Sequence, residues 1–152
     1  MAAMRIGIGI DHAGVPLRET VMQAIGDAGH EVVDLGEHDD YPDIALDVGR
    51  AIAAGEIARA ILVCGSGAGV AVAANKLAGI RASVCHDHYT AAQCVGHDDC
   101  NVLCLGARVI GPAIASELTA AFCAAQFSGE ERHARRVGKV LKMERDGLEA
   151  SW

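Results

Sequence analysis

Ala60-Ile-Leu-Val-Cys64 is an apolar run that continues directly into the glycine-rich segment Gly65-Ser-Gly-Ala-Gly69. Such a run predicts a buried strand, and glycines before the next apolar stretch predict a tight turn into a helix. Similar runs recur along the chain, separated by amphipathic stretches. The strands are expected at residues 5–10, 31–34, 60–64, 80–84 and 101–105, with helices around 16–28, 43–55, 69–77, 87–95 and 113–125.

Short strands that alternate with helices favour right-handed crossovers and a parallel sheet covered on both faces. The sequence therefore predicts an α/β protein with a three-layer αβα, Rossmann-like fold and a five-stranded parallel sheet. A last helix is expected over about 130–149, where one stripe holds Val137, Val140, Leu141 and Leu148. No linker or repeat interrupts residues 1–152, which are expected to form one domain.

The composition argues against several classes of function. The 152 residues are 51% hydrophobic and 22% charged, as in a folded domain. A net charge of −7 and only 3% aromatic residues argue against a nucleic-acid partner. No stretch reaches the roughly 18 apolar residues of a membrane span, and Met1-Ala-Ala-Met-Arg5 does not resemble a signal peptide. The six cysteines are therefore expected to be reduced thiols in a cytoplasmic protein.

Basic side chains concentrate near the end of the sequence. Residues 132–152 hold six of the 13 basic side chains but only three of the 20 acidic ones. Arg132 and Arg136 lie four residues apart and so share one side of the expected last helix. This pattern indicates either a local anion site or a solvated helix face.

In parallel sheets of this kind, ligands bind beyond the carboxyl ends of the strands. Polar or glycine-rich segments at these ends are Asp11-His12, Gly65–Gly69 and Arg108, and a loop with His97–Asp99 is expected just before the fifth strand. The glycine segment can direct backbone N–H groups at negative charge, although it lacks the residues of a Walker loop or a dinucleotide fingerprint. The alternative is a tight turn without a ligand.

Cys64 ends the third expected strand beside this segment. A thiol near the positive end of a helix forms thiolate more readily and could act as a base or a nucleophile, whereas the alternative is a buried core cysteine. His97 is interpreted as a group that exchanges protons near neutral pH, with a surface histidine as the alternative. The residues from Cys85 to Cys100 include metal-binding types but no Cys-x-x-Cys pair, so no metal site is expected.

Taken together, these motifs resemble those of ribose-5-phosphate isomerase B and the galactose-6-phosphate isomerase subunits. The matching motifs, in family order, are Asp11-His-Ala-Gly14, Asp40-Tyr-Pro-Asp43, Cys64-Gly-Ser-Gly-Ala-Gly69, Ala73-Ala-Asn-Lys76, His97-Asp-Asp99, Asn101-Val-Leu103, Gly106-Ala-Arg-Val109 and Arg132-His-Ala-Arg-Arg136. The resemblance covers about residues 4–146. It implies cofactor-free interconversion of a phosphorylated aldose and its ketose by a homodimer, often paired into a homotetramer, with the last helix and the active sites at the subunit interface.

The resemblance also implies a role for individual residues. Cys64 would be the base, Ser66 would relay protons between oxygens, and His97 with Asp11 would assist ring opening. The backbone N–H groups of Ser66–Gly69 would stabilise the enediolate. The substrate-binding residues would be His12, Tyr41, Gly65, Gly67, Ala68, Gly69, Asp98, Arg108, Arg132 and Arg136, with the phosphate held by His12 and the three arginines and the pocket wall formed by Tyr41.

The chain departs from the family pattern close to His97. Asp98 replaces the usual asparagine, so a carboxylate adds negative charge beside an enediolate, and Gly96 stands where many relatives have arginine. Cys64 together with Val70 resembles the branch that uses cysteine as the base. Ribose 5-phosphate is the expected substrate, with another four- to six-carbon sugar phosphate (tetrose, allose or galactose 6-phosphate type) left open. The residues also leave open a metal-dependent hydride-shift isomerase and a sugar-phosphate binding module without turnover.

Overall fold

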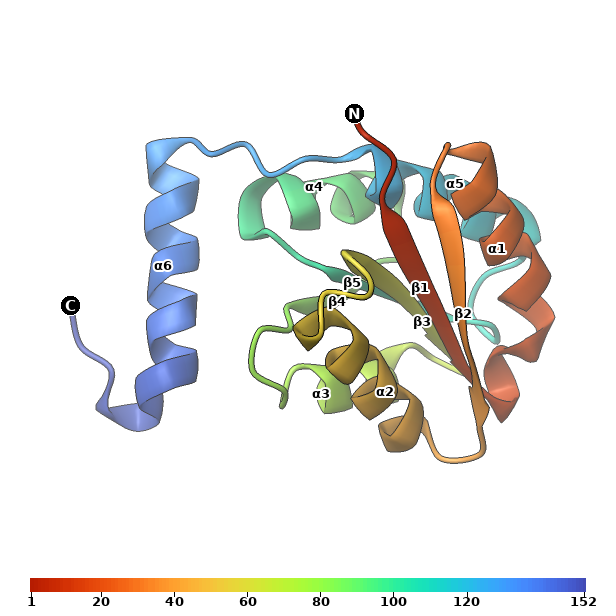
Figure 1. Ribbon diagram of the computed structural model, residues 1–152, viewed down its shortest axis with the longest axis horizontal. Coiled ribbons are helices and arrows are strands. Elements are labelled where there is room, and N and C mark those ends of the chain that lie inside the picture. Colours follow the sequence, from red (N-terminus) through yellow and green to blue (C-terminus); the bar gives the residue numbers. More distant parts are fainter.

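The computed structural model describes residues 1–152 and confirms the expected α/β class. Five strands form one sheet in the order β2-β1-β3-β5-β4, and every neighbouring pair is parallel (Figure 1). The strands are β1 (Arg5–Asp11), β2 (Glu31–His38), β3 (Arg59–Cys64), β4 (Ala82–Val84) and β5 (Val102–Gly106).

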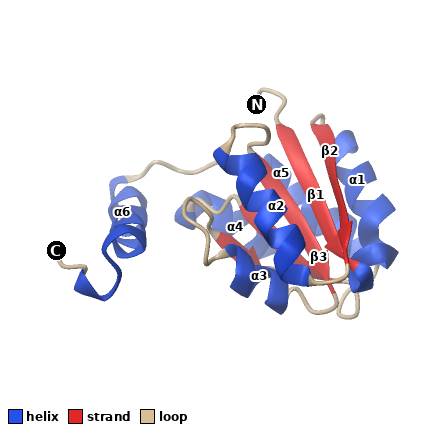
Figure 2. Cartoon of the chain, turned by 60° about the horizontal axis from the view of Figure 1, so that its bottom comes forward, coloured by secondary structure: helices blue, strands red, loops and turns tan.

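Helices cover both faces of the sheet and produce three layers (Figure 2). One face is covered by α1 (Arg18–Asp27), α4 (His88–Asp98) and α5 (Pro112–Ala124), and the other by α2 (Tyr41–Ala53) and α3 (Ala68–Ala74). A 3-10 turn, η1 (His12–Leu17), leads into α1, and the chain ends with α6 (Glu131–Asp146) and the short η2 (Gly147–Glu149).

The core is divided between the two faces because successive side chains of a strand point in opposite directions. In β3, Ile61 and Val63 pack under α1, α4 and α5, whereas Leu62 and Cys64 pack under α2 and α3. Cys64 is the last residue of β3. Its side chain therefore lies on the α2–α3 face, at the edge of the sheet where all five strands end.

Several expected boundaries are wrong. β2 continues to His38 instead of ending at residue 34, and α3 ends at Ala74 instead of residue 77. α4 continues through His97 and Asp98, which therefore lie in a helical turn and not in a loop. The helix ends at Asp98 and is capped by Asp99, whose φ of 51° is left-handed and whose N–H donates back to the last turn. The last helix ends at Asp146, and Leu148 lies beyond it, fully exposed, instead of on its apolar stripe.

α6 stands away from the three layers, joined to α5 by an extended segment (Figures 1 and 2). It contacts the rest of the chain through α4 and through Glu144, whose carboxylate accepts the N–H of Gly79 over 2.8 Å. Only His133 and Val137 are buried on this helix. Its exposed apolar residues are Val140, Leu141 and Met143. None of the helices could cross a membrane, as none combines the necessary length and apolar character.

Candidate active site

The loop between β3 and α3 is fixed by its own hydrogen bonds. Gly67 has a left-handed φ of 82°, which glycine adopts without strain, and its N–H donates to the Sγ of Cys64 over 3.1 Å. The N–H of Ala68 donates to the Oγ of Ser66 over 3.1 Å. The N–H groups of Ser66 and Gly69 have no partner within the chain. Two of the four predicted anion-binding amides are therefore free, and the other two hold Cys64 and Ser66.

The end of β5 packs directly against this loop. Gly106 lies so close that an added Cβ would be 2.6 Å from the carbonyl carbon of Ser66. The N–H groups of Ala107 and Arg108 donate to the carbonyl oxygens of Cys64 and Gly65 over 2.9 and 3.0 Å. These contacts hold the end of β5 (Gly106–Arg108) against the segment Cys64–Ser66, and the two together are called the rim below.

A pocket of about 350 Å³ opens at this rim. Its lining residues come from the ends of β1, β3 and β5 and the start of α2: Asp11, His12, Ala13, Tyr41, Cys64, Gly65, Ser66, Gly69, Arg108 and Val109. Cys64 is only 3% exposed, yet it belongs to the pocket wall. A nucleophilic or basic thiol at this position would meet a bound ligand with little competing water.

Asp11 and His12 are held by hydrogen bonds at the end of β1. The Oδ1 of Asp11 accepts the N–H groups of Ala13 and Gly14 over 2.8 and 3.1 Å and so caps η1. The Nδ1 of His12 lies 2.9 Å from the carbonyl oxygen of Asp39, which can only accept. Nδ1 therefore carries the hydrogen, and Nε2 is the ring nitrogen left for a ligand.

Arg108 and Tyr41 lie against the glycines of the loop. An added Cβ on Gly65 would lie 3.3 Å from the Nη1 of Arg108, and one on Gly69 would lie 3.2 Å from the Tyr41 ring. Arg108 takes part in none of the ion pairs of the chain. Its charge is therefore available to an anion beside the free amides of the loop.

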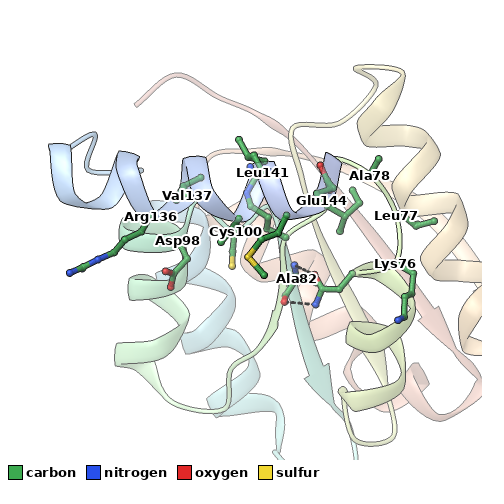
Figure 3. Close-up of a pocket in the computed structure, with 15 residues that line it drawn as sticks. Lys76, Leu77, Ala78, Ala82, Asp98, Cys100, Arg136, Val137, Leu141 and Glu144 are labelled. Atoms are coloured by element: carbon green, nitrogen blue, oxygen red, sulfur yellow. Dashed lines mark hydrogen bonds between the residues drawn. The ribbon is translucent and has the colours of Figure 1, made fainter. Parts of the chain in front are cut away.

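Of the other predicted residues, Gly67 and Ala68 belong to the glycine loop but do not line the pocket, and four lie on other elements. His97 and Asp98 lie in the last turn of α4, and Arg132 and Arg136 lie on α6. Asp98 and Arg136 line a larger cavity of about 810 Å³ between α6 and the segment 75–82, and the Arg136 side chain extends away from the rest of its lining (Figure 3). No residue lines both cavities. The predicted site is thus divided into two groups on one chain.

His97 packs against His133, a residue to which the sequence motifs assign no role. Its imidazole is stacked on that of His133, with ring centroids 4.0 Å apart and the planes inclined by 23°. Burial, together with the nearby His97 and Arg132, lowers the pKa of His133. The sequence does contain a signal that His133 faces the interior. It lies four and seven residues before Val137 and Val140, and these positions share one face of a helix.

The sequence model of the family described as Ribose/Galactose Isomerase matches residues 6–140. The chain belongs to this family. Ribose-5-phosphate isomerase B of Escherichia coli is 41% identical over 144 residues, which are 92% of this chain and 96% of that protein. D-erythrulose-4-phosphate isomerase of Pectobacterium atrosepticum is 40% identical over 131 residues, 83% of this chain and 86% of that protein. The structure of type B ribose 5-phosphate isomerase of Trypanosoma brucei matches with a TM-score of 0.88 at 45% identity, covering 92% of this chain and 98% of that one.

This member of the ribose/galactose isomerase family keeps its remaining cysteines in the core. Cys85, Cys94, Cys100, Cys104 and Cys123 are all buried. A hydrogen bond with Cys94 lowers the pKa of Cys85 to about 7, whereas burial raises the pKa of Cys123 to about 11. No group of three or more His, Cys, Asp or Glu side chains is arranged to hold a metal ion. Cys64 differs from the other five because it alone lines the pocket of the glycine loop.

Proposed function

We propose that this protein is an aldose–ketose isomerase that converts ribose 5-phosphate and ribulose 5-phosphate into one another. The observation that carries the proposal is the Cys64 thiol in a pocket that also offers free backbone N–H groups and the unpaired guanidinium of Arg108. The names of the relatives, ribose-5-phosphate isomerase B and D-erythrulose-4-phosphate isomerase, support the same class of reaction.

The residues of the pocket fit an enediolate mechanism. The Cys64 thiolate, stabilised by the N–H of Gly67, removes the proton from C2 of the open-chain aldose. The negative charge that develops on the sugar oxygens is stabilised by the free N–H groups of Ser66 and Gly69. The Ser66 hydroxyl moves a proton between O1 and O2, and the thiol returns its proton to C1 to give the ketose. His12 and Arg108 bind the phosphate at the far end of the sugar.

We further propose that the working site is shared between two copies of the chain. His97, Asp98, Arg132 and Arg136 line no part of the Cys64 pocket of their own chain, and the apolar residues of α6 are exposed. A second copy that packs against α6 would cover these residues. The Cys64 pocket of that copy would receive the two arginines near the phosphate and His97 near the ring oxygen. Pairing into tetramers and a cytoplasmic location stay predictions.

Hydrogen exchange with solvent tests the reaction directly. In heavy water, proton transfer through Cys64 exchanges solvent deuterium into the sugar, and NMR is expected to detect deuterium at C1 of ribulose 5-phosphate and at C2 of ribose 5-phosphate. Isomerisation without any exchange would favour a hydride shift. Tight binding with neither exchange nor isomerisation would favour a binding module and contradict the proposal.

A four-carbon substrate is a second candidate because Asp98 replaces the family asparagine and one relative of 40% identity is named for erythrulose 4-phosphate. A comparison of kcat/KM for aldose phosphates of four, five and six carbons distinguishes the candidates. We expect ribose 5-phosphate to give the highest value. A higher value for erythrose 4-phosphate would reassign the substrate and leave the reaction class intact.

A further inference from the structure

His133 is a buried imidazole on a helix that is otherwise largely exposed. It is 3% exposed, and burial of a polar ring is unfavourable unless its nitrogens have partners. Its Nδ1 lies 2.6 Å from the Oγ of Ser128. The N–H of Ser128 donates to the carbonyl oxygen of Gly96 over 3.0 Å, and the Oγ also accepts the N–H of Glu130 over 3.2 Å. Through Ser128, His133 is thus connected to the last turn of α4.

The imidazole of His133 also packs against one face of the His97 ring. The stack of the two rings, with centroids 4.0 Å apart, restricts the plane of the His97 ring from one side. The Nε2 of Gln93 lies 3.1 Å from the Nδ1 of His97 and restricts its rotation. Because Nδ1 already has a partner, Nε2 is the nitrogen of His97 that remains for a ligand.

We infer that His133 is a positioning residue that orients the His97 imidazole and couples it to α6. Arg132 precedes His133 directly and Arg136 follows it by three residues, so the stack fixes His97 relative to both arginines. His97 and the arginines then enter the second copy's pocket as one rigid unit. The inference rests on the proposed function, in which His97 assists opening of the sugar ring.

A role in packing alone would require only that the space of His133 is filled. His133→Leu fills much of this space without an aromatic ring, whereas His133→Phe keeps a ring that can stack on His97. The two variants therefore separate positioning from packing.

The first readout compares two substrates. Ribose 5-phosphate closes into a five-membered ring, which has to be opened before isomerisation. Erythrose 4-phosphate cannot form such a ring, because its O4 carries the phosphate. We expect His133→Leu to lower kcat for ribose 5-phosphate about tenfold or more, with a much smaller effect on erythrose 4-phosphate, and His133→Phe to restore most of the loss. His97→Ala is the reference and is expected to show the same selectivity with a larger loss, about 100-fold.

The second readout does not depend on turnover. In protein labelled with ¹³C at histidine, the ring current of His133 shifts the Cε1–H signal of His97, and this shift should disappear in His133→Leu and persist in His133→Phe. An unchanged His97 signal in His133→Leu, or equal losses on both substrates, would overturn the inference. A wild-type protein that isomerises neither sugar would contradict the proposed function, while the NMR signal still tests whether His133 stacks on His97.

Discussion

Cys64 and Cys104 occupy neighbouring strands and belong to the same apolar core, yet their surroundings differ. Cys104 is completely buried, and this burial raises the pKa of its thiol well above the usual range. The Sγ of Cys64 instead accepts the N–H of Gly67, and the residue lines the pocket. The two cysteines therefore provide a matched pair for testing which thiol carries the chemistry.

We expect Cys64→Ala to lower kcat about 10²- to 10⁴-fold, because the proposed mechanism then lacks its base for proton transfer. Cys104→Ala should retain most of the activity and lose about 1–2 kcal/mol of unfolding free energy, because it leaves a small cavity. Steady-state kinetics and chemical denaturation of both variants measure these effects. Full activity of Cys64→Ala would remove this residue from the mechanism.

His86 is expected to make the stability of the protein depend on pH. Its Nε2 accepts the N–H of Gly106 over 3.0 Å, and burial lowers the pKa of His86. In the unfolded chain a histidine takes up its proton at about pH 6.5, whereas in the folded chain it does so only at lower pH. The unfolded state therefore binds more protons, and stability is expected to fall as the pH drops below about 6.5.

The measurement is the thermal midpoint at about pH 7.5 and about pH 5.5 for the wild type and for His86→Leu. The wild type should lose more than the variant over this interval, since the variant lacks the titrating ring. The buried His133 contributes in the same direction in both proteins, so it does not affect the comparison. An equal loss in the two proteins would exclude His86 as a source of the pH dependence.

At the scale of elements, α6 carries charged residues with different surroundings. Arg135 pairs with Glu131 one turn earlier, with a shortest distance of 3.0 Å. Arg136 takes part in no ion pair within the chain and lines the larger cavity. The two arginines are adjacent in sequence and exposed, which makes them a suitable pair for substitution.

Arg136→Ala is expected to raise KM for ribose 5-phosphate about 10- to 100-fold with a smaller change in kcat, because a charged hydrogen bond to phosphate contributes about 1.5–3 kcal/mol. Arg135→Ala should leave both constants nearly unchanged. Initial-rate kinetics test the pair. Equal effects of the two substitutions would indicate that only the overall positive charge of α6 matters.

The sequence predicts the buried strands β3 and β5 better than it predicts the exposed strand end of β2 or the helix ends. Every residue of β5, and five of the six in β3, are buried, and this burial is visible as continuous apolar runs. The end of α4 could not be predicted from residue type, because its left-handed C-cap is Asp99 and not the glycine that usually signals such an end. This difference moved His97 from an expected loop into a helix.

At the scale of the whole molecule, the residues of the candidate site form two halves, and the sequence predicts the position of only one of them. The half that contains Asp11, Cys64 and Arg108 could be predicted because parallel strands end at one edge of the sheet. The position of α6 could not, because the segment 125–130 that directs it has no periodic pattern. The motifs name the residues of the second half without indicating whether they complete a pocket of their own chain or of a second copy.

Mixing of two inactive variants tests the shared site. If Cys64 and His97 act from different chains, random pairing of Cys64→Ala and His97→Ala chains leaves about a quarter of the sites with both native residues. We expect the mixture, after denaturation and refolding together, to regain about that share of wild-type activity. If both residues act from one chain, every site keeps one substitution and no activity returns.

The position of α6 after all the strands in the sequence has a consequence for folding during translation. Both apolar cores are complete by Cys123, so the ribosome has released every strand and the wall of the Cys64 pocket before α6 emerges. A nascent chain can therefore finish the first half of its site unaided. If the proposed sharing of the site is correct, the second half has to wait for another finished polypeptide, and a cell that makes few copies would hold folded but idle chains until two of them meet.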